Sequence, residues 1–349
     1  MRPEIEHLIS EGPVTSSDIL SRRDFLAASA TGAALTQAAV ATPRDPLANR
    51  AMVAITLDLE MSRNFPAWEM THWDYEKGNL NDETKRWAVE ACRRVRQAGG
   101  LAHCFAVGRV FEQADVGWLR GIVEAGHAVG NHTYDHVNVK AEWPEAIQFR
   151  FRRCPWLIEG KTVEQVVREN IQLTTAALRT RVGIPPAGFR TPGGFTNGLR
   201  DREALQRMLQ NLGFSWVSSL YTDHAVGPAR REPTPQVVQS IVEAQGRAQP
   251  FLYPSGLIEI PMSPISDIGA FRTGRWRLEW FLSVVRQSLA WCIDNRAVFD
   301  FLCHPSCMYV VDPEFRTVEL ICDMVRRAGE RAALVTLDRV ADRLRPARP

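Results

Sequence analysis

The sequence lacks the cysteine pattern of a disulfide-bonded or zinc-thiolate protein. Its seven cysteines are odd in number and lie far apart, so no disulfide framework is expected. The closest pair, Cys303 and Cys307, has no second pair with which to complete a zinc site of thiolates. We therefore interpret the cysteines as small, buried apolar residues.

The sequence also lacks concentrated charge and any sign of a second folded domain. The formal net charge is +2 and the basic residues are scattered, which argues against a nucleic-acid-binding surface or a polybasic membrane patch. With 349 residues, of which 45% are hydrophobic, the chain is long enough for one large domain with a sizeable core. Nothing in the sequence indicates an oligomeric state.

The first forty residues have the pattern of an export signal. Arg22 and Arg23 precede an uncharged, alanine-rich stretch that ends in small residues near Ala41, and the paired arginines resemble the twin-arginine type. We therefore predict that residues 1–41 are an export signal and that the protein reaches the periplasm or the cell surface. The alternative is a short alanine-rich helix of the fold. Because the stretch is too short and too weakly apolar to span a membrane stably, membrane contact is expected only through the signal.

Buried strands alternate with helices over residues 42–349, which we predict to be a single domain. Residues 51–57 are an apolar run with β-branched residues, typical of a buried strand. A helix with one apolar face follows, from a cap at Asn81 to a stop at Gly99. Further strands are expected near residues 101–107, 127–130, 187–190, 214–218, 257–260, 298–303 and 332–335.

Seven or eight buried strands, each followed by a helix, predict an α/β fold, an irregular (β/α) barrel. The rival architecture is a doubly wound open sheet. That sheet usually carries a glycine-rich first turn for a dinucleotide, whereas the first strand here ends in Asp-Leu-Glu. The barrel is therefore the favoured prediction.

Polar side chains that could perform chemistry occur at corresponding places along the chain. Asp58 and Glu60 end the first strand, and His132 follows the third. Arg190 ends the fourth, and His304 follows the strand at residues 298–303. Because the carboxyl ends of barrel strands meet at one mouth, we expect these groups to form one site.

The residue types at this mouth suggest a metal-dependent hydrolase. His132 and His136 are four residues apart, so on one helical turn their imidazoles would point the same way. Two histidines and one carboxylate are a common ligand set for catalytic zinc. Asp58 and Glu60 would lie on one face of a strand, where one could bind the metal while the other takes a proton from metal-bound water.

Four segments in this order resemble the motifs of the NodB-homology polysaccharide deacetylases, carbohydrate esterase family four. The acidic first motif is met by residues 56–60, and the His-Ser/Thr-x-x-His metal motif by residues 132–136. The Arg-x-Pro-x-Gly motif is met by residues 190–194, and the Leu-x-His motif by residues 302–304. The resemblance covers roughly residues 51–345 and implies the family's irregular (β/α) barrel, a NodB-like deacetylase fold.

The resemblance implies a metal centre and a reaction. Glu60, His132 and His136 would be the metal ligands, and the expected cofactor is a divalent metal, most suitably Zn²⁺. Metal-activated water would attack an N-acetyl carbonyl and give acetate and a free amine. The chain would then be a polysaccharide deacetylase, a hydrolase of carbon–nitrogen bonds other than peptide bonds.

The resemblance also implies catalytic roles for three further residues. Asp58 would be the general base, Arg190 its tether, and His304 the general acid that protonates the leaving amine. The spaced Asp-x-Glu pair departs from the family's adjacent aspartates, which leaves open which acid is the base and which the ligand. The aspartate that usually orients the catalytic histidine is also missing, and Asp223 or Asp267 could replace it.

Three functions are compatible with this site. The leading expectation is removal of N-acetyl groups from a carbohydrate such as peptidoglycan, a chitin-like polymer or another amino-sugar polymer. The second is hydrolysis of a small amide or ureide, as in allantoinase-like relatives, with an aromatic insertion at residues 61–80 capping a small pocket. The third is a glycan-binding pseudoenzyme.

Overall fold

The computed structural model describes residue 47 and residues 49–345, apart from 73–75. The predicted export segment, residues 1–41, lies outside these described residues. Among them, no helix is both long and apolar enough to cross a membrane.

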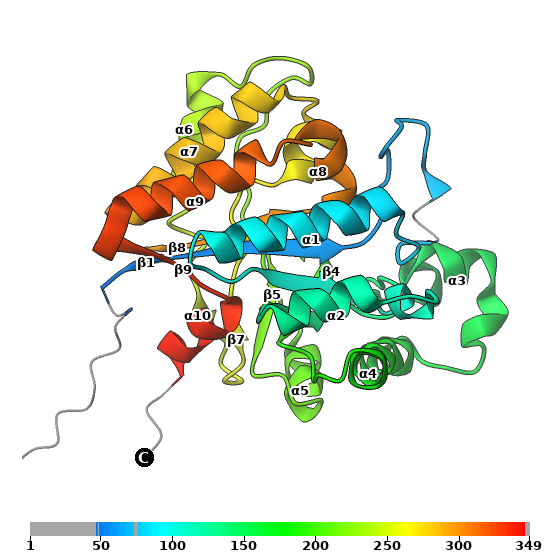
Figure 1. Cartoon of the computed structure of the whole chain (residues 1–349). Helices are drawn as coiled ribbons and strands as arrows, with labels where there is room; N and C mark the ends of the chain where they lie inside the picture. The colour runs from blue at the N-terminus through cyan, green and yellow to red at the C-terminus, as the bar shows by residue number, and fades with distance from the viewer. Residues whose placement is uncertain (1–46, 48, 73–75, 346–349) are drawn as a thin grey trace, which may run out of the picture. The chain divides into compact units, whose positions relative to one another are not determined.

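A single mixed sheet organises the described part of the chain (Figure 1). Its strands follow one another in the order β6-β7-β5-β4-β3-β2-β1-β8, with β9 also paired to β1. All pairs are parallel except β6 with β7. The strands are β1 (Ala51–Leu59), β2 (His103–Ala106), β3 (Ala128–Asn131), β4 (Phe189–Phe195), β5 (Trp216–Leu220), β6 (Phe251–Leu252), β7 (Ile258–Glu259), β8 (Val298–Cys303) and β9 (Ala332–Leu334).

This strand order is that of a barrel opened between β7 and β8. The first strand lies beside β8, as in a closed barrel, but β7 and β8 do not pair. The side chain of Gln249 bridges part of the opening: it accepts from the Val298 amide at 2.8 Å and donates to the Val298 carbonyl at 3.1 Å. The predicted irregular (β/α) barrel is therefore confirmed.

Helices cover the outer face of the sheet. In Figure 1, α1, α7 and α9 cross the sheet on one side of β1, and α2, α4 and α5 lie on the other. Neighbouring helices contact one another in the order α6, α7, α9, α1 and α2. The long helices are α1 (Asp82–Gln97), α2 (Gly117–Glu124), α4 (Val163–Arg181), α5 (Glu203–Asn211), α6 (Pro235–Ala244), α7 (Leu278–Asp294), α9 (Arg316–Ala328) and α10 (Leu337–Leu344).

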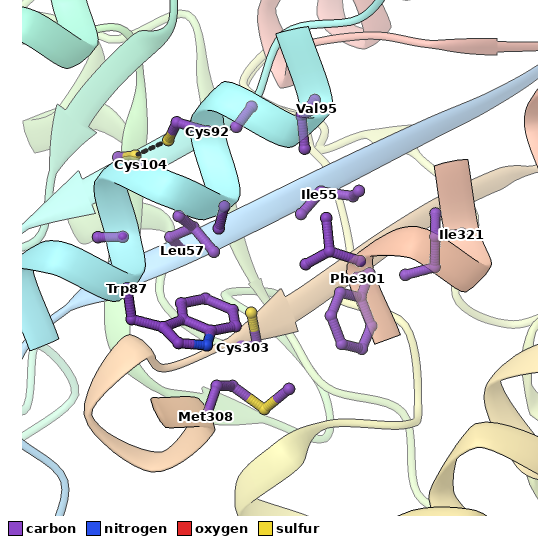
Figure 2. Close-up of a cluster of buried hydrophobic side chains, with 14 of the residues drawn as sticks. Ile55, Leu57, Trp87, Cys92, Val95, Cys104, Phe301, Cys303, Met308 and Ile321 are labelled. Carbon is purple, nitrogen blue, oxygen red and sulfur yellow. Dashed lines mark hydrogen bonds between the residues drawn. The ribbon is translucent and has the colours of Figure 1, made fainter. Parts of the chain in front are cut away.

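The alternation of side chains along β1 separates an outer core from the barrel interior. Ile55 and Leu57 point outward into the main hydrophobic cluster, where they meet Trp87 of α1 and Phe301 of β8 (Figure 2). Met52 and Ala54 point inward, to a second cluster that includes α10 at the amino end of the barrel. The next inward residues along β1 are polar, and they lead toward the mouth.

Several elements differ from the predicted ones. The sequence did not predict α6, because the prolines before it indicated a loop. Thr234 caps this helix and Pro235 occupies its first turn, where the missing N–H costs no hydrogen bond. The prediction that Arg190 ends its strand was wrong: β4 continues to Phe195 with an irregular register. Arg190 consequently lies deeper in the barrel than expected, with no exposed surface.

Candidate active site

The site lies where the inward side of β1 reaches the mouth of the barrel. Thr56 and Asp58 are successive inward residues, and the strand ends at Leu59. A backbone hydrogen bond from the Glu60 amide to the Asp58 carbonyl, at 3.0 Å, then turns the chain. Both carboxylates are only 3% exposed. They approach the same imidazole, since Asp58 Oδ2 and Glu60 Oε2 each lie 3.6 Å from His132 Nε2.

Glu60, His132 and His136 form the metal-compatible group found among the described residues. One ligand atom from each lies within 4.8 Å of the other two. Glu60 Oε2 is 2.6 Å from His136 Nε2 and is buried, yet no described donor makes a well-directed hydrogen bond to it. An orphaned carboxylate oxygen between two imidazole nitrogens fits a divalent cation in their midst. The exposed His72, from the insertion, does not belong to this group.

The two histidines converge by a route that the sequence did not predict. They do not share a helical turn: the segment after β3 is irregular, with positive φ angles of 58° at Thr133 and 56° at His136. Asn131 holds this loop by accepting from the Thr133 amide at 2.9 Å. His132 Nδ1 donates to the Arg190 carbonyl at 2.9 Å, which leaves Nε2 facing the carboxylates and available to a metal.

The electrostatics of the group also favour a cation. Burial alone would raise the pKa of Glu60, but His136 and Lys77 lower it well below its usual value. Burial lowers the pKa of His136 to about 4, so its imidazole is neutral. Lys77 Nζ lies 3.1 Å from Glu60 Oε1, on the carboxylate oxygen other than the orphaned one. Thus one oxygen is held by an ammonium while the other faces the histidines.

Arg190 holds Asp58 from below through a buried polar layer. Its Nη1 donates to Asp58 Oδ1 at 3.1 Å and to Thr56 Oγ1 at 2.8 Å. Its Nη2 donates to Asp300 of β8 and to Ser218 of β5. Burial raises the pKa of Asp300 to about 6, although Arg190 acts to lower it. Asp58 is therefore oriented with its second oxygen, Oδ2, toward the mouth.

His304 faces the two carboxylates from the opposite side. It follows β8 and precedes α8 (Pro305–Val311), and its Nε2 lies 3.9 Å from Asp58 Oδ2 and 3.8 Å from Glu60 Oε1. Asp267 accepts from His304 Nδ1 at 3.0 Å and from the His304 amide at 2.6 Å. Burial alone would lower the pKa of His304, but the Asp267 carboxylate raises it above its usual value.

The structure brings together all six residues expected at the site and adds three that sequence reasoning missed or left open. Of the two candidates to orient His304, Asp267 makes the contact, whereas the side chain of Asp223 is 79% exposed and pairs with Arg247. Asp300 was missed, although it lies at an inward position of β8. A single acid within an otherwise apolar strand was the feature of the sequence that could have indicated it. Lys77 was missed because it lies in the insertion, where no strand pattern places it.

These groups line an open cavity of about 310 Å³, which we call the main cavity. Its wall includes Asp58, Glu60, His132, His136 and His304. Thr191, Gly193 and Gly194 of β4 and Tyr221 after β5 complete one side. The arrangement offers a metal site, an oriented carboxylate and a histidine that holds a proton, all reachable from one cavity.

Comparison with known proteins agrees with the sequence motifs. Residues 79–214 match the family model for polysaccharide deacetylase. The match includes His132, His136 and Arg190 but ends before His304 and begins after Glu60. No functionally curated protein matches the sequence.

Solved structures share the fold at low sequence identity. A putative polysaccharide deacetylase from Mycobacterium smegmatis has a TM-score of 0.55 and 15% identity, over 86% of this chain and 95% of that one. A probable polysaccharide deacetylase from Pseudomonas aeruginosa PAO1 has a TM-score of 0.58 and 13% identity, over 86% and 93%. Puue allantoinase has a TM-score of 0.56 and 13% identity, over 87% and 94%. At these identities the likeness establishes the fold alone.

Proposed function

We propose that this chain, whose residues 79–214 match the family model for polysaccharide deacetylase, removes N-acetyl groups from a carbohydrate by metal-dependent hydrolysis. One observation carries the proposal. Asp58, Glu60 and His304, which lie outside the matched segment, converge on His132 and His136 in a single cavity. That convergence supports the assignment of a base, a metal site and an acid to one reaction.

Glu60, His132 and His136 would hold the metal, with one carboxylate oxygen and two imidazole nitrogens as donors. This donor set suits Zn²⁺, which we propose as the natural metal. When bound, such an ion supplies a water of lowered pKa and a Lewis acid for the substrate carbonyl.

The chain's own residues move and hold the protons. Asp58 takes a proton from the attacking water at Oδ2, while Arg190 donates to its Oδ1 and fixes the orientation of the carboxylate. His304 donates a proton from Nε2 to the leaving nitrogen, and Asp267 stabilises the charged imidazole through Nδ1. The products are acetate and an amine.

The sequence of the first 41 residues supports a location outside the cytoplasm. We propose twin-arginine export, with the carbohydrate substrate in the periplasm or at the cell surface. Removal of residues 1–41, or replacement of Arg22 and Arg23 by lysine, should retain the protein in the cytoplasmic fraction. Unchanged fractionation would contradict this location.

Acetate release from the purified, metal-loaded protein tests the activity. We expect acetate from acetylated chitooligosaccharides or peptidoglycan, and a loss of about 10²–10⁴-fold in His304→Gln, because the leaving nitrogen then has no acid. Arg286→Gln, an exposed change on α7, should keep full activity.

Two other outcomes correspond to other functions. Turnover of allantoin or another ureide with no acetate from any glycan would favour an amidohydrolase for small molecules, which the fold likeness to an allantoinase permits. Binding of glycans without turnover of any substrate would indicate a pseudoenzyme.

A further inference from the structure

A second hollow adjoins the main cavity and shares part of its wall. It has a volume of about 300 Å³, and we call it the side cavity. Lys77, His136, Gly193 and Arg272 line both hollows. A substrate whose acetamide reaches Glu60 and the histidines can therefore extend another group into the side cavity.

The side cavity is rich in positive charge. Lys77, Arg152 and Arg272 lie in its wall, and the acid among its lining residues is Glu145, which is exposed at the rim. Phe149, 42% exposed, adds an apolar face to the same wall.

Among the described residues, Arg152 and Arg272 differ from the neighbouring arginines in lacking a paired carboxylate. Arg109 and Arg150 both pair with Asp135, at 2.5 and 2.8 Å. Within the described part of the chain, neither Arg152 nor the half-buried Arg272 has a carboxylate partner. Arg152 instead lies over the Phe149 ring, 5.5 Å from its centre, and donates to the Glu145 carbonyl at 3.5 Å. Arg152 is exposed, whereas the guanidinium of Arg272 is partly removed from water, which is costly unless a ligand supplies an anion.

The positions of the cations are fixed by the catalytic framework. The Lys77 carbonyl accepts from the Met61 amide at 2.8 Å, which closes the insertion beside Glu60. Arg272 belongs to the π-helix Ile268–Thr273, which begins directly after Asp267, the partner of His304. The insertion also meets the residues just after this π-helix, where Arg275 lies over the Trp68 ring, 3.6 Å from its centre.

We propose that the side cavity is an anion subsite, in which Arg272 and Arg152, assisted by Lys77, bind a carboxylate or phosphate group carried by the substrate next to its N-acetyl group. The proposal rests on the deacetylase function and specifies its substrate class as an acidic N-acetylated sugar. The planar guanidinium groups suit the oxygens of either acid, and Phe149 offers a surface for a sugar ring.

Calorimetric binding to the metal-loaded full-length protein tests this assignment. The probes are N-acetylmuramic acid, its methyl ester, and N-acetylglucosamine 6-phosphate. We expect at least one of the two acids to bind about tenfold or more tightly than the neutral ester, and Arg272→Gln to remove that preference without weakening the ester. Whichever of the two acids binds more tightly shows whether the subsite prefers a carboxylate or a phosphate. Arg152→Gln should show the same pattern, and the exposed Arg286→Gln, with the same charge change, should not.

Equal affinity for the acids and the ester, or an unchanged preference in both Arg272→Gln and Arg152→Gln, would overturn the subsite. Acetate release is measured in parallel, so that the two proposals fail separately. Acid-selective binding without acetate from any glycan would overturn the deacetylase function and keep the subsite. Acetate released from acidic and neutral sugars with the same KM in wild type and Arg272→Gln would overturn the subsite and keep the function.

Discussion

Arg190 is a single guanidinium that pairs with two buried carboxylates, those of Asp58 and Asp300. Its removal tests how much these buried ion pairs contribute to stability. In Arg190→Met, Asp58 and Asp300 lose their common partner while a side chain of similar length fills the space. Removing one partner of a buried ion pair typically destabilises a protein by about 3–5 kcal/mol. We expect a loss in this range at pH 8.

The loss should depend on pH in a direction set by Asp300. Its pKa, about 6, lies above the value of about 3.9 in an unfolded chain, so its contribution to stability is greatest at low pH and is lost as pH rises through 6. Without Arg190, which lowers this pKa, the pKa of Asp300 rises further. The variant therefore keeps a proton on Asp300 at pH values above 6, where the wild type has released it. At pH 5 the destabilisation should be smaller by about 2 kcal/mol.

Urea unfolding at pH 5 and pH 8, with chelator in every sample, measures both quantities. Arg190→Met/Asp300→Asn should recover about 1–3 kcal/mol at pH 8, because the uncompensated carboxylate is gone. The exposed Arg286→Met should change the free energy of unfolding by less than about 0.5 kcal/mol. Equal destabilisation at both pH values, together with no recovery in the double variant, would refute the account of this layer.

Two further predictions separate the roles of the acids around the metal site. Glu60→Gln should reduce the metal content of the protein, measured by elemental analysis. Asp58→Asn should keep the metal but lower the rate of hydrolysis by about 10²–10⁴-fold. The reverse pattern would show that Asp58 is the metal ligand and Glu60 the base. Asp267→Asn should lower the pKa of His304, because burial lowers it and Asp267 is the main group that raises it, so the alkaline limb of the rate profile should move to lower pH. Asp223→Asn is the matched control, and a limb that stays in place in Asp267→Asn would contradict the orienting role.

The fold was predictable where the pattern of apolar and capping residues in the sequence directly indicates a buried strand or a helix end. The run at β1 and the strand at β8, found at its predicted bounds Val298–Cys303, contain consecutive apolar residues because both faces of these strands are covered. The helix α4 was predictable from its capping box, Thr162 with Gln165. The opening between β7 and β8 was not, because strand pairing depends on residues distant in sequence.

The site was predictable to the extent that strand ends determine it. Residues after β1, β3 and β8 meet because parallel strands share one carboxyl edge. The convergence of His132 and His136 depends instead on positive φ angles in an irregular loop, which the i,i+4 spacing does not encode. Lys77 reaches Glu60 from an insertion of about twenty residues, and such a contact has no local signature.

The spacing of the first motif follows from the geometry of β1. Asp58 points into the barrel and Leu59 points outward into the hydrophobic cluster, so an acid at position 59 would face the helices. Glu60 is the next residue that can turn inward, and it does so as the strand ends, with its amide bonded to the Asp58 carbonyl. A longer side chain then spans the remaining distance to His136, and Lys77 compensates its charge on the far oxygen. One arrangement thus combines the Asp-x-Glu pattern with the insertion that carries Lys77. In it, one Glu60 oxygen pairs with Lys77 and the other faces the histidines. Lys77→Met should accordingly change the position of the Glu60 carboxylate more than that of the Asp58 carboxylate, because Arg190 holds Asp58 independently.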